Sequence, residues 1–180
     1  MTFEPAEPAT PGKPFLAAML ALFTVLACFM TYPQALHMRD GVNDVGDPLL
    51  NVWALSWVAH EAPRSPSGVF DGNIFYPEPK ALVFSETLLA PALAVAPLRW
   101  LGAGAILVYN LVFLSGFVLS GVGTVLLVYS LTADRGASIV AGAIFAFLPY
   151  RIDHYAHLQL QQTQCIPLAL WALHRVAATG

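Results

Sequence analysis

The sequence predicts an all-α integral membrane protein, a multi-spanning helical bundle with a large first outer loop that carries interfacial helices. Hydrophobic residues make up 57% of the 180 residues. Charged residues make up only 11%, whereas soluble domains carry about 25%. Uncharged runs long enough to cross a bilayer recur along the chain. The net charge of −3 indicates no nucleic-acid partner, and the two cysteines predict no disulfide framework.

Residues 1–14 are rich in Pro, Ala and Glu and are expected to form a disordered cytoplasmic tail. Residues 15–36 carry no charge and predict the first span, since a helix needs about 20 residues to cross the bilayer core. A cleaved signal peptide is the alternative. It is disfavoured because the apolar run exceeds the ~7–15 residues of a signal h-region and the basic region before it is weak.

Residues 37–103 form the predicted outer loop. Asp47 followed by Pro48 is typical of a helix start, which predicts a helix from an Asp47 cap to about His60. Residues 87–98 are too few for a comfortable span and include two prolines, so we expect an interfacial or re-entrant helix there.

Two tryptophans, Trp53 and Trp57, share one face of the first of these helices, which favours a position among lipid headgroups. After the loop, residues 107–131 predict the second span and 136–150 the third. Residues 165–180 open a fourth span that is cut short, so we expect the N-terminal module of a longer protein.

Orientation follows from the basic residues near the span ends. Lys13, Arg135 and Arg175 fall on one side if residues 87–98 do not cross, and this predicts a cytoplasmic N-terminus. Small residues at helical spacing, including Gly121 and Gly142, predict close packing of the spans.

Several polar residues admit a local explanation. Asp47 is explained as a helix cap, and Asp44 as the acceptor of an Asx turn before Gly46. Glu86 is either a ligand-binding group or a solvated carboxylate at a helix start.

The second polar segment, residues 151–164, contains a candidate half-site for a divalent metal. In a helix, Asp153 and His157 share a face, with His154 on the neighbouring turn. Zinc takes three or four protein ligands, so hydrogen-bonding histidines on a polar helix are the favoured alternative. Gln159 and Gln161 add groups able to bind sugar hydroxyls or headgroups.

In the order of these parts, the chain resembles the GT-C superfamily of integral-membrane glycosyltransferases. That superfamily includes oligosaccharyltransferase catalytic subunits, protein mannosyltransferases and lipid A aminoarabinose transferases. The resemblance covers nearly the whole chain after residue 14, and its motifs are NDVGDP at 43–48, NIFYP at 73–77, SETLL at 85–89, LTADR at 131–135, PYR at 149–151 and HLQLQ at 157–161.

The resemblance implies an inverting sugar transfer from a polyprenyl-phosphate donor to a glycan, lipid or protein acceptor of the cell envelope. The reaction is expected on the non-cytoplasmic face of a bacterial inner membrane. A first-loop carboxylate, Asp47 or Asp44, is expected to be the general base. Arg151 is the first candidate cation for the donor phosphate, with Arg99 second.

The substrate-binding candidates are Glu86, Arg151, His154, His157, Gln159 and Gln161. A divalent metal is one candidate cofactor, because some members of the superfamily depend on one. The competing hypothesis is a non-enzymatic membrane protein, either a transporter or flippase piece or an assembly subunit. Transporters place polar groups at mid-membrane, whereas the acids here cluster in loops and at span ends, which favours the enzyme.

Overall fold

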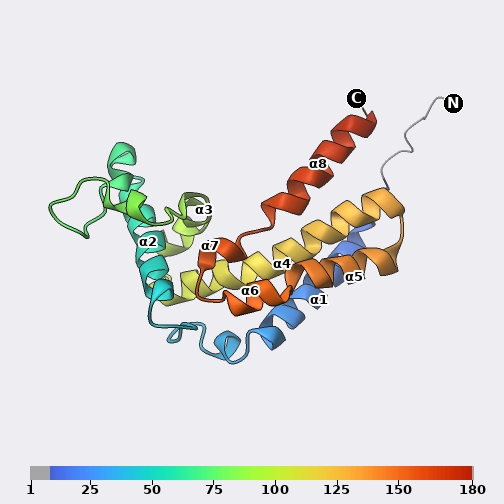
Figure 1. The fold of residues 1–180 in the computed structure, drawn as a ribbon, viewed down its shortest axis with the longest axis horizontal. Coiled ribbons are helices and arrows are strands. Elements are labelled where there is room, and N and C mark those ends of the chain that lie inside the picture. The colour runs from blue at the N-terminus through green and yellow to red at the C-terminus, as the bar shows by residue number, and fades with distance from the viewer. Residues whose placement is uncertain (1–8, 180) are drawn as a thin grey trace. The chain divides into compact units, whose positions relative to one another are not determined.

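The computed structural model describes residues 9–179, and within that range the chain is helical and contains no strand (Figure 1). The α-helices are α1 (Lys13–Met30), α2 (Asp47–Glu61), α3 (Leu89–Trp100), α4 (Ala105–Thr132), α5 (Arg135–Ala146), α6 (Pro149–Asp153), α7 (Leu158–Gln161) and α8 (Cys165–Thr179). Short 3₁₀ turns occur at Gln34–Leu36, Pro66–Phe70 and Ala81–Phe84. The predicted all-α class is confirmed.

Three stretches among the described residues are long and apolar enough to cross a membrane. They are Lys13–Met30, Ala105–Thr132 and Arg135–Asp153, the last of which comprises α5 and α6. These lengths and compositions indicate a membrane protein. Helix α3 has 12 residues and is not one of the three, in keeping with the prediction that residues 87–98 do not form an ordinary span.

The predicted boundaries differ from the observed ones mainly at prolines. The first span was expected to reach residue 36, but α1 ends at Met30 because Pro33 lacks the amide hydrogen that a continuing helix needs. The third span was expected to reach residue 150. Instead α5 ends at Ala146, and Leu148 is extended before Pro149, as residues before proline prefer.

The start of the first helix also differs from expectation. The tail was expected to reach residue 14, but α1 already begins at Lys13, with Pro14 in its first turn, where proline is favoured. Residues 1–8 of that predicted tail lie outside the described residues. Helix α8 has 15 residues and is not among the three stretches long enough to span.

The chain divides into two compact units. The first unit contains described residues 9–31, 114–154 and 160–179. The second unit contains Tyr32–Phe113 and Tyr155–Gln159. Helix α4 therefore contributes its first part to the second unit and its remainder to the first.

Helices of the first unit meet at small residues. Phe23 of α1 is fully buried and lies against Gly121 of α4. A Cβ added at Gly142 of α5 would lie 2.9 Å from the carbonyl oxygen of Gly121 and 2.9 Å from Phe23 Cζ. The predicted close packing through small residues is thus confirmed for these three helices.

Replacing Gly142 by valine is expected to destabilise the protein by about 1–3 kcal/mol, the usual cost of overpacking a close contact. The thermal unfolding midpoint of detergent-solubilised protein measures this loss. The control is Gly104→Val, since no atom lies within 4 Å of a Cβ at Gly104. Equal midpoints for the two variants would contradict the helix contact.

In the second unit, α2 packs against α3. The indole nitrogen of Trp100, at the end of α3, donates to the carbonyl of Ala59 near the end of α2 at 2.8 Å. Ser85 and Glu86, which precede α3, line a cavity together with the first turn of α2. The two helices are therefore neighbours in this unit.

Two tryptophans of α2 organise the loop that follows. Trp53 and Trp57 stack with ring centroids 6.3 Å apart, so their predicted common face is confirmed. Trp53 Nε1 donates to Asn73 Oδ1 at 2.9 Å, and Trp57 Nε1 donates to the carbonyl of Val69 at 2.8 Å. Both indole N–H groups therefore hold the loop, while the predicted position among headgroups remains a prediction.

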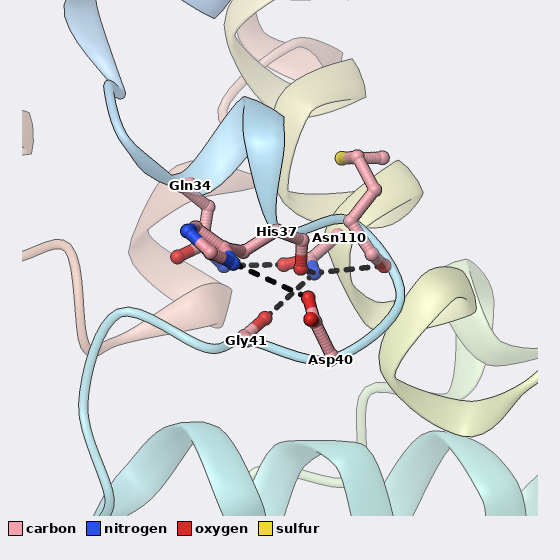
Figure 2. Close-up of polar contacts among 6 residues, drawn as sticks. Gln34, His37, Asp40, Gly41 and Asn110 are labelled. Carbon is pink, nitrogen blue, oxygen red and sulfur yellow. Dashed lines mark hydrogen bonds and ion pairs between the residues drawn. The ribbon is translucent and has the colours of Figure 1, made fainter.

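A buried amide holds the beginning of the outer loop. Asn110, near the start of α4, is fully buried, and its Nδ2 donates to the carbonyls of His37, Met38 and Gly41 at 3.4, 3.1 and 2.9 Å. Its Oδ1 accepts from Gln34 Nε2. Figure 2 shows these groups around the Asn110 side chain, with the His37–Asp40 ion pair beside them. One side chain thereby fixes the backbone that leads toward α2.

Candidate functional site

A polar cavity of about 270 Å³ lies in the second unit, at the start of α2. Its walls come from α2, from the segment before α3 and from the segment 155–159. The lining residues are Asp47, Leu50, Asn51, Ser85, Glu86, His157 and Gln159. Three segments that are distant in sequence therefore bring their polar side chains to one place.

Asp47 is the first residue of α2, and Gly46 occupies the cap position without a side-chain capping bond. The prediction that Asp47 is the N-cap is therefore wrong. Because Asp47 is already inside the helix, its carboxylate extends elsewhere, and Oδ2 lies 3.3 Å from Nε2 of His157. A capping role therefore does not explain the position of the Asp47 carboxylate, which lines the cavity beside His157.

Asp44 has the local role that its sequence context predicts. Its Oδ1 accepts from the amide of Gly46 at 3.0 Å, which confirms the Asx turn. The neighbouring Asn43 accepts from the hydroxyl of the buried Tyr109 at 3.0 Å, so α4 supports this turn. Asp44 is not among the residues that line the cavity.

Two amide side chains of the cavity each have one buried atom without a hydrogen-bond partner. Asn51 is 3% exposed, and its Nδ2 has no partner. Oε1 of Gln159 is likewise buried and has none. An unsatisfied buried polar atom costs about 1–3 kcal/mol, so such atoms in a cavity wall favour a polar ligand. Sequence reasoning missed Asn51, although its position four residues after Asp47 gives both the same helix face.

Glu86 joins the same cavity from the segment before α3. Its Oε2 accepts from the hydroxyl of Ser85 at 3.1 Å. Because α3 begins only at Leu89 and has no acid in its first turn, Glu86 is not the helix-start carboxylate that one interpretation expected. The cavity thus holds two carboxylates and one imidazole.

Comparison with models of protein families, with curated proteins and with solved structures finds no match. Function is therefore inferred from the residues of the cavity and from the resemblance carried by the sequence motifs.

The other predicted binding residues belong to the first unit. Arg151 is 2% exposed, and its guanidinium donates to the carbonyls of Ala146 and Gln161 at 2.9 and 2.7 Å and lies 4.4 Å from the Phe117 ring centroid. Gln161 is fully buried and donates to the carbonyls of Arg151 and His154 at 3.1 and 2.8 Å. These bonds stabilise the turn after α6, and Arg151, His154 and Gln161 are not among the residues that line the cavity at Asp47.

The predicted metal half-site depended on one helix through Asp153 and His157. That helix is absent, because α6 ends at Asp153 and α7 begins only at Leu158. Asp153 lies 3.9 Å from Nδ1 of His154, which also lies 2.8 Å from the carbonyl of Tyr150, whereas His157 meets Asp47. Within residues 9–179, no group of three or more His, Cys, Asp or Glu side chains is arranged to hold a metal.

Proposed function

We propose that this chain is a membrane glycosyltransferase that uses a polyprenyl-phosphate sugar donor. The acceptor is a glycan, lipid or protein of the cell envelope. The observation that carries the proposal is the cavity in which Asp47, not used for capping, lies 3.3 Å from His157 and shares a wall with Asn51, Glu86 and Gln159. The GT-C-like order of motifs supports the same assignment.

In this proposal, Asp47 acts as the general base. Its carboxylate takes the proton of the acceptor hydroxyl while that oxygen forms a bond to the anomeric carbon of the donor sugar. The bond from the anomeric carbon to the phosphate oxygen breaks, and its electron pair leaves with the polyprenyl phosphate. His157 orients Asp47 through the contact between Nε2 and Oδ2. The Asp47 side chain is 56% exposed, which lets an acceptor hydroxyl approach.

The two amides suit a hydroxyl group. A hydroxyl accepts a hydrogen bond from an amide N–H and donates one to an amide oxygen, so it satisfies both Asn51 Nδ2 and Gln159 Oε1. An ionised phosphate has no proton for the Gln159 oxygen. We therefore assign Asn51 and Gln159 to sugar or acceptor hydroxyls and not to the leaving phosphate.

Asn51→Leu is expected to raise the KM for the sugar donor roughly tenfold, the value of about one hydrogen bond of 1.4 kcal/mol, with a smaller change in kcat. Donors lacking one hydroxyl test the contact directly. The donor that lacks the hydroxyl bound by Asn51 should react poorly with the wild-type protein. The Asn51→Leu variant should use this deoxy donor and the parent sugar donor equally well. Asn73→Leu removes an exposed amide outside the cavity and serves as the control. If Asn51→Leu still preferred the parent donor over the deoxy donor as strongly as wild type does, the assignment of Asn51 to a sugar hydroxyl would be contradicted.

The reaction is proposed on the non-cytoplasmic face of a bacterial inner membrane, with the N-terminus in the cytoplasm. Thiols introduced at Ser67 and Asp153, in a background where Cys28 and Cys165 are serine, should both react with an impermeant reagent added from outside. Ser67 is exposed, and the Asp153 side chain is 86% exposed. Labelling at Ser67 alone would mean that residues 87–98 cross the membrane, which would separate the two polar segments.

The activity itself is tested by expressing the protein in membranes with a panel of polyprenyl-phosphate sugars and measuring the loss of each donor. Consumption of one donor together with product formation would support the transferase. No consumption of any donor would favour the competing hypothesis of a non-enzymatic membrane protein.

A further inference from the structure

A second polar cavity, of about 360 Å³, lies at the other end of the α2–α3 pair. It is lined by Ser56, Ala59, His60, Arg64, Arg99 and Trp100. With a rise of 1.5 Å per residue, Asp47 and His60 lie about 20 Å apart along α2. The second cavity is therefore separate from the cavity that contains Asp47, and a group bound there is too far away to be the leaving group of a reaction at Asp47.

The lining of this cavity carries positive charge. Two guanidinium groups and one imidazole contribute to it, and none of the six lining residues is acidic. Glu61, the nearest acid along α2, faces another segment, since its Oε1 lies 3.5 Å from where a Cβ of Gly68 would stand. Within residues 9–179, neither Arg64 nor Arg99 forms an ion pair with a carboxylate.

Both arginines are held in place by the backbone. Arg64 Nη1 donates to the carbonyl of His60, and Arg99 Nη1 donates to the carbonyl of Ala103. Basic residues at helix ends commonly make such bonds. Each bond uses one of the five N–H donors of a guanidinium. Capping therefore does not explain why Arg99, from the end of α3, and Arg64, from the turn after α2, line the same cavity. Their remaining donors are preorganised for a ligand.

We propose that this cavity binds a phosphate group, supplied either by the headgroup of an anionic lipid or by a free phosphate. The forked donors of arginine match phosphate oxygens in pairs, and two arginines give a tetrahedral anion more contacts than a planar carboxylate can use. Trp100, 59% exposed at the rim, adds an amphipathic ring of the kind found at membrane interfaces. The chain also has three stretches long and apolar enough to span a membrane, and a protein in a membrane is surrounded by lipid headgroups.

The test uses the full chain in an uncharged detergent and counts bound molecules by native mass spectrometry. The probes are phosphatidylglycerol, with phosphatidylcholine as the zwitterionic comparison, and inorganic phosphate as competitor. Arg64→Gln with Arg99→Gln removes two positive charges from the cavity. Arg39→Gln with Lys80→Gln removes two positive charges from the same unit without touching this cavity. Equal thermal midpoints in the absence of ligand establish that both double variants are folded. If the cavity variant unfolds, the single substitutions replace it.

Wild type is expected to retain phosphatidylglycerol in preference to phosphatidylcholine, with affinity falling roughly tenfold or more in the cavity variant and little in the control pair. Arg64→Lys with Arg99→Lys should bind at an intermediate level, because it keeps the charge and loses the forked donors. Arginine-dependent binding of inorganic phosphate without a lipid preference would support the site and identify a soluble source. No binding of either probe by wild type, or equal losses in the two double variants, would overturn the proposal.

Discussion

Asp47→Asn is expected to lower the rate of sugar transfer by roughly 10²–10⁴-fold, the usual contribution of a general base. Asparagine has nearly the same shape, and Asp47 makes no capping bond, so the substitution should leave α2 and the protein fold unchanged. The loss should therefore appear in kcat, because the amide cannot take the acceptor proton. The measurement is donor consumption at saturating donor concentration, in membranes that contain equal amounts of each variant.

Two further acids sharpen this test. Asp71→Asn is the control, since Asp71 is exposed, lies outside the cavity and accepts one bond from the amide of Lys80 that asparagine also accepts. Asp44→Asn should retain most activity, because an asparagine oxygen maintains the Asx turn to Gly46. Full transfer by Asp47→Asn would refute Asp47 as the base, and a larger loss in Asp44→Asn would transfer that role to Asp44.

Asn110→Leu is expected to destabilise the protein on the order of 3 kcal/mol or more, because it leaves several polar groups around the loop without their partner. Leucine has a similar volume, so packing in α4 changes little. Asn110→Asp should be at least as harmful, since it replaces the donor with an oxygen that faces three carbonyl oxygens. For a chain of this size we expect the thermal midpoint to fall by roughly 5–10 °C.

The matched control for this prediction is Asn73→Leu, which removes one exposed hydrogen bond to Trp53 by the same chemical change. An exposed bond of this kind is worth about 1 kcal/mol or less. Similar midpoints for Asn73→Leu and Asn110→Leu would mean that the loop 37–41 does not depend on Asn110.

The local structure of the chain was largely predictable from its sequence. The long apolar run of α4, the helix start around Asp47-Pro48 and the turn at Asp44 depend on hydropathy, on proline geometry and on a side chain that reaches two residues ahead. The predicted start of α2 was wrong by one residue, because Gly46 and not Asp47 occupies the cap position. The shift of the cap from Asp47 to Gly46 is one residue in sequence, yet it redirects a carboxylate from its own backbone into a cavity.

The roles of the polar residues were less predictable, because they depend on partners that are distant in sequence. Nothing in the local pattern of Arg151 indicates that Gln161, Ala146 and Phe117 surround its guanidinium. Likewise, no local pattern at Asn110 indicates that its side chain donates to carbonyls of the loop about 70 residues earlier in the chain (Figure 2). The fold brings these partners together from distant parts of the sequence, and the hydropathy pattern alone does not predict such contacts.

By itself, the sequence determined that this is an all-helical chain with apolar stretches able to cross a membrane, because hydropathy and helix length are summed over local residues. Only the tertiary structure decided which acid meets His157, that Asn51 and Gln159 line the same cavity, and that Arg64 and Arg99 share another. The physical reason is that packing of α2 against α3 and the segment 155–159 brings together residues from separate parts of the chain, and no local pattern encodes that meeting.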